Sequence, residues 1–144
     1  MGIPSGIEFS QHLTMEEYNH LRVAVGWQPV ATRLARNSLD NALYMTVARE
    51  DGHPVGMARV LGDGGYILYI ADVIVLPSHQ RVGIGTRMME HVMAYIDGYT
   101  QPGERVFVNL MAAAGKEPFY SRFGFTLRPD GALGAGMSMY YGRD

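Results

Sequence analysis

The stretch that decides the fold is DVIVLPSHQRVGIGT, residues 72–86. It begins with an acidic residue followed by four apolar residues, which is typical of a buried strand. Pro77 ends that pattern, and Gly83 and Gly85 lead into an apolar repeat typical of a helix. Glycine has no Cβ, so a ligand can approach the backbone, and the unpaired N–H groups of a helix's first turn attract anions. The stretch therefore predicts a strand, a loop and a helix that together hold a phosphate ester.

The glycine spacing excludes two common nucleotide-binding motifs. A dinucleotide-binding loop needs a third glycine three residues after the second, but that position is Met88. A P-loop needs a lysine between its last glycine and the following Ser or Thr, whereas Gly85 is followed directly by Thr86. Neither a Rossmann fold nor a P-loop nucleotidase is expected.

Composition indicates an ordinary globular protein. The 144 residues suit a single domain spanning residues 1–144, and 47% of them are hydrophobic against 18% charged. The net charge of −2 comes without a basic stripe, so neither nucleic acid nor a membrane is expected as a partner. The five histidines have no metal-ligand spacing, so no metal is expected.

The cellular compartment and the type of nucleophile also follow from composition. The N-terminal residues lack the basic and apolar regions of a signal peptide, so a cytoplasmic location is expected. The chain has no cysteine, which excludes disulfides, thiolate zinc sites and a cysteine nucleophile.

Local patterns predict two helices and a hairpin in the first half of the chain. Thr14 to Glu17 forms a capping box for a helix that ends at Gly26. A second helix, with Pro29 in its first turn, runs to about Asn41 and turns Leu34 and Leu39 inward. Strands follow at residues 44–50 and 55–61, joined by an Asp-Gly turn at residues 51–52.

The second half predicts a strand, helix and strand unit. A long apolar strand covers residues 66–76, and a helix with an apolar stripe covers residues 84–96, ended by Gly98. A second buried strand at 106–111, a short helix at 118–123 and tail strands at 125–128 and 137–141 complete the order. The fold class is therefore mixed α/β (α+β), with antiparallel strands first and a parallel pair at the centre.

Two motifs in this order resemble one family. The segment QRVGIG, residues 80–85, matches the Q/R-x-x-G-x-G/A pyrophosphate loop of the GNAT superfamily of acyl-CoA-dependent N-acyltransferases. About 35 residues later, EPFYSRFGF, residues 117–125, resembles that family's F-Y-x-K/R-x-G-F motif. The resemblance covers essentially the whole chain and implies the GNAT fold, with a splayed parallel pair and flanking helices.

The resemblance also implies how acetyl-CoA binds. Ile74 and Val75 would pair backbone groups with the pantetheine arm, as a false strand. Backbone amides from Val82 to Thr86 would hold the pyrophosphate. The implied cofactor-binding residues are Ile74, Val75, Gln80, Arg81, Val82, Gly83, Ile84, Gly85 and Thr86. The alternative for Gln80 and Arg81 is that they are solvated loop residues that do not contact the cofactor.

Two residues are catalytic candidates. Tyr120 occupies the position of the family's tyrosine, which implies a general acid that protonates the departing sulfur; its alternative is core packing. Asp72 lies in an apolar strand, where a carboxylate needs a partner, and it is a candidate general base. Its alternative is a bond to a neighbouring loop or to Arg59. Asp63 or a water chain are further candidates for the base.

The sequence departs from the family pattern in one segment. Many members carry an Asn before the short helix, where this chain has Ala112 to Lys116, so contacts of that Asn are not carried over. The implied function is transfer of an acetyl group from acetyl-CoA to a primary amine of a small molecule in a ternary complex. The alternatives are a non-catalytic acyl-CoA-binding module and a protein lysine or N-terminal acetyltransferase. A homodimer is compatible with the family.

Overall fold

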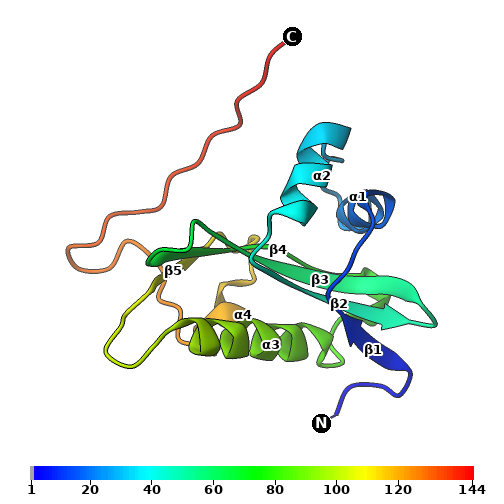
Figure 1. Cartoon of the computed structure of the whole chain (residues 1–144), viewed down its shortest axis with the longest axis horizontal. Coiled ribbons are helices and arrows are strands. Elements are labelled where there is room, and N and C mark those ends of the chain that lie inside the picture. The colour runs from blue at the N-terminus through cyan, green and yellow to red at the C-terminus, as the bar shows by residue number, and fades with distance from the viewer. Residues whose placement is uncertain (1) are drawn as a thin grey trace. The chain divides into compact units, whose positions relative to one another are not determined.

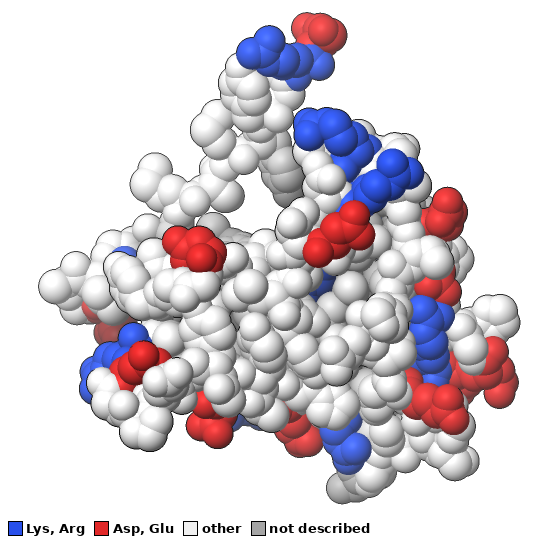
Figure 2. Space-filling model, viewed as in Figure 1, with Lys and Arg blue, Asp and Glu red and all other residues white. Residues whose placement is uncertain are grey.

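The structure is a computed structural model that describes residues 2–144. The chain forms two compact units, Met1–Leu110 and Met111–Asp144, and each is described by itself. That residues 1–144 form a single domain stays a prediction. Among the described residues, no helix is both long and apolar enough to cross a membrane. Lys and Arg are interspersed with Asp and Glu on the face seen in Figure 2.

The first unit is a five-stranded mixed sheet between two helical layers. Its strands lie in the order β1 (Ile7–Ser10), β2 (Tyr44–Glu50), β3 (His53–Gly62), β4 (Ile67–Val75) and β5 (Phe107–Leu110). Neighbours are antiparallel except β4 and β5, which are parallel. Helices α1 (Met15–Ala24) and α2 (Thr32–Asp40) cover one face, and α3 (Ile84–Tyr99) covers the other (Figure 1). The predicted mixed α/β class is confirmed.

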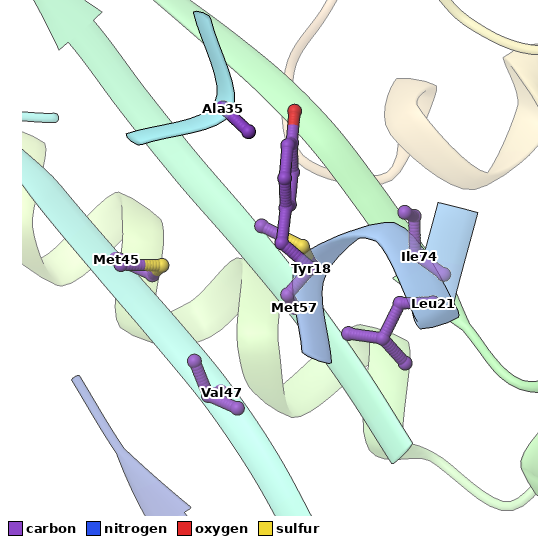
Figure 3. Packing of buried hydrophobic residues seen from close by; sticks show 7 residues of the cluster. All are labelled: Tyr18, Leu21, Ala35, Met45, Val47, Met57 and Ile74. Carbon is purple, nitrogen blue, oxygen red and sulfur yellow. The ribbon is translucent and has the colours of Figure 1, made fainter. Parts of the chain in front are cut away.

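The core on the α1 side is built from large side chains on every neighbouring element. Tyr18 and Leu21 from α1 and Ala35 from α2 pack on Met57 and Ile74 of the sheet (Figure 3). Full burial of a side chain such as Leu21 contributes about 2 kcal/mol relative to exposure. This packing fixes α1 over β3 and β4, the strands that carry the candidate site.

On the opposite face, a glycine lets α3 approach the sheet closely. A Cβ on Gly56 would lie 2.9 Å from the Ile74 carbonyl oxygen and 3.2 Å from Met88 Sδ. Both contacts are shorter than normal packing allows, so only glycine fits between β4 and α3. Gly56 thereby sets how near the start of α3 lies to the end of β4.

The predicted hairpin and capping box are confirmed. Asp51 and Gly52 both have positive φ, at 51° and 79°, as a tight turn between twisted strands requires. Thr14 caps α1 by accepting from the Glu17 amide, while the Glu17 carboxylate accepts from the Thr14 amide. Arg49 on β2 donates to both Glu17 oxygens, at 2.8 and 2.9 Å. The cap is thus joined to the sheet.

Stability should fall in acid through Glu17. The Arg49 guanidinium lowers the pKa of Glu17 from 4.5 to about 2. Because the folded pKa is depressed, this stabilisation is fully present above pH 4.5 and is lost as the pH falls toward 2. Gln can still form the capping box, so Glu17→Gln should cost about 1 kcal/mol at pH 7 and progressively less below pH 4.5. Urea unfolding of both proteins between pH 7 and 3 checks this. Parallel curves over that range would contradict it.

Three features of the N-terminal half differ from the sequence predictions. Strand β1 was not predicted, although it pairs with β2 from Ile7 to Ser10. Helix α2 begins at Thr32, after Pro29, because the Asn19 side chain bonds both backbone groups of Val30 and holds that segment extended. The buried residue of α2 is Ala35, and its neighbour Leu34 is 49% exposed, since successive helical residues point about 100° apart.

Two boundaries in the second half also differ. Gly98 lies inside α3, because Tyr99 donates from its hydroxyl to the Gly65 carbonyl and holds the last helical turn. The expected strand at 106–111 is the shorter β5, which forms an edge of the sheet with Phe107 exposed rather than buried. The parallel pair therefore lies at one side of the described sheet.

The second unit holds the short helix α4 (Glu117–Ser121) and the tail. Phe119 contacts Tyr120 and Phe123 edge to face, and Gly124, at φ 93°, ends the segment. The tail strands expected at 125–128 and 137–141 are not formed. The described tail contains one bridge, between Asp130 and Leu133, and an isolated strand without a partner is not stable.

Candidate active site

The loop after β4 has the backbone that an anion cradle needs. The 3-10 turn η1 (Pro77–His79) follows β4, and Gln80 closes the loop by donating from Nε2 to the Val75 carbonyl at 2.8 Å. Arg81 and Gly83 then take positive φ values of 66° and 94°. Alternation of left-handed and ordinary conformations turns successive N–H groups to one side and forms a concavity for anions.

The N-terminus of α3 is capped by a residue that offers no side chain. Gly83 is the N-cap and makes no side-chain cap bond, in contrast to Thr14 at α1. The positive end of the helix dipole is therefore left to a ligand. Ile84 is buried against Ala48 and Met88, and half-buried Val82 packs on the same cluster, which fixes this end of the helix. Gly85 and Thr86 complete the first turn.

Strand β4 is irregular at its middle and open along its second half. Met57 of β3 pairs with Ile74 of β4, and Arg59 pairs with Ala71. Between these two pairs, Asp72 and Val73 of β4 together oppose the single residue Ala58 of β3, which is a β-bulge. Pairing with β5 ends at Ile70. Asp72 and Val73 thus have no one-to-one register partner on either neighbouring strand of the described sheet. The open edge of β4 towards β5 begins after Ile70.

Asp72 is the bulged residue and has a φ of 53°. A non-glycine residue in this conformation costs of order 1 kcal/mol and persists where its surroundings determine it. Its Oδ1 accepts from Arg22 at 2.9 Å, and its Oδ2 accepts from Arg59 Nε at 2.8 Å and from the Tyr18 hydroxyl at 2.7 Å. We call Tyr18, Arg22, Arg59 and Asp72 the Asp72 cluster.

The Asp72 cluster is largely buried, and its one carboxylate is paired with two guanidinium groups. The Arg59 and Asp72 side chains are 8% and 10% exposed, so their charges are balanced inside the protein rather than by water. Arg59 also donates to the Ser38 carbonyl of α2, at 3.0 Å. Burial and the bond to Asp72 raise the pKa of Tyr18 to about 12, so its hydroxyl stays a donor. The cluster ties α1, α2 and β3 to the bulge.

Tyr120 belongs to the second unit and lies on α4. Tyr120 is 8% exposed. Its ring is edge-on to the rings of Phe119 and Phe125, at centroid distances of 5.0 and 6.4 Å. Burial raises the pKa of Tyr120 to about 12. The phenol therefore carries its proton throughout the neutral range.

Comparison with known proteins decides the family. The profile described as "Acetyltransferase (GNAT) domain" matches residues 41–127, a range that contains the bulge, the loop and Tyr120. The chain belongs to the GNAT acetyltransferase family. This membership confirms the resemblance and the acyltransferase class predicted from the sequence, and the family uses acetyl-CoA as acyl donor.

Individual relatives agree with membership in the GNAT family. A rice protein, serotonin N-acetyltransferase 2, chloroplastic, is 29% identical over 93% of this chain and 66% of its own length. GCN5-related N-acetyltransferase 1, chloroplastic, from Arabidopsis thaliana is 30% identical over 87% of this chain and 62% of its own. The chain thus spans slightly less than two thirds of these relatives.

A solved structure has the same fold at a similar level of identity. A protein of unknown function from Staphylococcus aureus superposes with a TM-score of 0.85 and 33% identity, covering 94% of this chain and 99% of its own. The similarity extends over nearly the whole of both chains.

The expected cytoplasmic location is wrong by this comparison. The rice and Arabidopsis GNAT relatives are both named as chloroplastic, which points to a plastid. Sequence reasoning used only the lack of signal-peptide features near the N-terminus, and that observation does not address import into an organelle.

Sequence reasoning missed some residues of the candidate site, and one candidate, Asp63, lies outside the Asp72 cluster. Arg22 and Tyr18 are about 50 residues from Asp72 in sequence, so no local pattern connected them. Glu117 begins the quoted second motif, and its Oε1 is a buried oxygen without a hydrogen-bond partner among the described residues. Asp63 lies in an exposed turn, where its Oδ1 accepts from the Gly65 amide at 2.9 Å.

Proposed function

We propose that this GNAT domain transfers the acetyl group of acetyl-CoA to a primary amine of a small molecule within a ternary complex. One observation carries the proposal: the loop at 80–86, with left-handed Arg81 and Gly83, joins the open edge of β4 to an α3 N-terminus without a side-chain cap. An anionic group and an extended amide-bearing chain are the ligands that these two features suit together.

Donor binding would rest mainly on backbone groups. The amides of Val82 to Thr86 would hold the pyrophosphate, and Ile74 and Val75 would offer the β4 edge to the pantetheine amides. The Gln80 side chain bonds the Val75 carbonyl, so its role would be to hold the loop closed onto the strand. Arg81 would contribute positive charge beside the pyrophosphate.

The chemistry needs no covalent bond to the protein. The amine nitrogen bonds to the acetyl carbonyl carbon, the C–S bond breaks, and the sulfur leaves as a thiol after accepting a proton. The carbonyl oxygen gains negative charge on the way, and an N–H from the bulged part of β4 would stabilise that charge. Asp72 and Val73 form this bulge, so their N–H groups would be the candidates.

Tyr120 would give the departing sulfur its proton. A tyrosine whose pKa is about 12 is fully protonated at neutral pH, so it can donate as soon as thiolate character develops. The attacking ammonium must lose a proton as well. Asp72 was a candidate base, but both its oxygens already accept from Arg22, Arg59 and Tyr18, so the arrangement favours a water chain.

A thermal-shift experiment tests the donor first. Acetyl-CoA and CoA should each raise the unfolding temperature, because a ligand at 100 times its dissociation constant adds about 2.7 kcal/mol to stability. ATP and NAD should shift it much less at the same concentration. Equal shifts with all four compounds, or none with either CoA species, would contradict acetyl-CoA binding.

An amine panel then tests turnover and acceptor class. Free thiol can be followed directly with a disulfide reagent, because the protein has no cysteine of its own. The panel should begin with an arylethylamine such as serotonin, since the rice relative is named for that acceptor, and include a lysine peptide and a protein N-terminal peptide. Release with the small amine alone supports the proposal. Thiol release only with peptides would favour a protein acetyltransferase. No thiol release with any amine would favour a non-catalytic binding module.

A further inference from the structure

We propose that Asp72 is a positioning residue, which through Tyr18, Arg22 and Arg59 holds the β4 bulge in the conformation needed for acyl transfer. The inference rests on the proposed acetyltransferase function. It assigns to the Asp72 cluster a role in placing backbone atoms rather than in accepting a proton.

The first argument is the conformation of Asp72 itself. A φ of 53° is unfavourable for a residue with a side chain, and the bulge leaves Asp72 outside the one-to-one register with either neighbouring strand of the described sheet. Among the described residues, the side-chain groups that hold Asp72 in place are the three donors to its carboxylate. The backbone direction at the bulge therefore depends on the side chain of Asp72.

The second argument is where those bonds come from. Tyr18 and Arg22 lie on α1 and Arg59 lies on β3, so the carboxylate is held by two elements that the hydrophobic core already fixes. Arg22 additionally lies over the Tyr18 ring, with 5.7 Å from its guanidinium carbon to the ring centroid. Each donor thus approaches the carboxylate from a rigid support.

The third argument is that the carboxylate is poorly placed to act as a base. Its two oxygens accept three bonds within 2.9 Å, two of them from guanidinium groups that remain charged. A proton taken from a substrate would have to displace one of these donors. A base would also not need the Tyr18 hydroxyl, whereas a support for the bulge does.

Three variants separate these roles. Tyr18→Phe removes one hydroxyl and leaves the ring in the core. Asp72→Asn removes the charge at nearly constant shape, and the double variant combines the two changes. Tyr66→Phe and Asp97→Asn are matched controls, because both residues are exposed on the first unit and outside the cluster. Each kcat is expressed per acetyl-CoA-binding site, and calorimetry measures how many sites each protein preparation has. Inactive protein in a preparation is therefore not counted.

We expect kcat to fall about 10-fold in Asp72→Asn and about 3-fold in Tyr18→Phe, with a nearly unchanged KM for acetyl-CoA. The double variant should resemble Asp72→Asn, because both changes release the same bulge. The pH profile of kcat/KM should keep its shape in every variant. Loss of its acid limb in Asp72→Asn alone, or an unchanged kcat in both single variants, would overturn the proposal.

Hydrogen exchange tests the bulge without reference to activity. The amides of Val73 to Val75 should exchange about 10-fold faster in Tyr18→Phe, while those of Thr46 to Ala48 on β2 should not change. Unchanged exchange on β4 overturns the positioning role even if the protein acetylates no amine. Faster exchange in a protein without turnover supports the hold on the bulge and rejects the proposed function separately.

Discussion

Replacing Tyr120 with phenylalanine is expected to lower the turnover number about 100-fold while leaving the affinity for acetyl-CoA nearly unchanged. The substitution removes only the hydroxyl, so the ring contacts with Phe119 and Phe125 remain. The departing sulfur would then have to leave as a thiolate or take a proton from water. Steady-state thiol release gives kcat, and calorimetry gives the dissociation constant.

The matched control for this substitution is Tyr140→Phe. Tyr140 lies in the same unit and is fully exposed, so loss of its hydroxyl should leave kcat unchanged. Equal turnover in Tyr120→Phe and the parent protein would remove the general-acid assignment. A fall in acetyl-CoA affinity equal to the fall in kcat/KM would instead place the Tyr120 hydroxyl in donor binding.

The second large effect is expected at Gly83, where valine should weaken acetyl-CoA binding about 30-fold or more. The φ of 94° is strained for any residue with a Cβ, and most strongly for a β-branched one. The new side chain would also meet Ile3, whose Cγ2 lies 3.6 Å from the Cβ position. Backbone amides at the start of α3 would turn away from the pyrophosphate. Calorimetric titration with acetyl-CoA measures the loss.

A control must separate this loss from general destabilisation. Gly103 has a similar φ of 84° but lies between α3 and β5, away from the loop, with nothing within 4 Å of a Cβ. Gly103→Val should therefore lower stability to a similar degree and keep acetyl-CoA affinity. If both variants lose affinity equally, the loop at 80–86 is not the donor site.

Local signals in the sequence were sufficient for much of the scaffold. The capping box at Thr14, the Asp51-Gly52 turn and the apolar stripe of α3 each depend on residues within a few positions of one another. The loop at 80–86 is local in the same sense, so its glycines and its place before a helix could be read directly. Strand β1 is an exception, because Ile7 and Phe9 do alternate with polar residues but form only four positions.

What the sequence did not disclose depends on contacts between distant residues. Asp72 was correctly expected to need a partner, and Arg59 was one alternative, but nothing near it in sequence indicates Tyr18 or Arg22. The extra residue in β4 is likewise a property of its register against β3 rather than of its own pattern. Tail strands were expected from alternation alone, which predicts a capacity to pair but not the presence of a partner.

The contact between Arg22 and Trp27 has a practical consequence. Trp27 is the chain's single tryptophan, and the Arg22 guanidinium carbon lies 5.3 Å from the ring centroid. Because indole emission responds to a neighbouring charge, the tryptophan fluorescence of the unlabelled protein, excited selectively over its tyrosines, reports on one site that touches the Asp72 cluster. Any ligand or substitution that moves Arg22 can thus be followed optically, in real time, without attaching a dye.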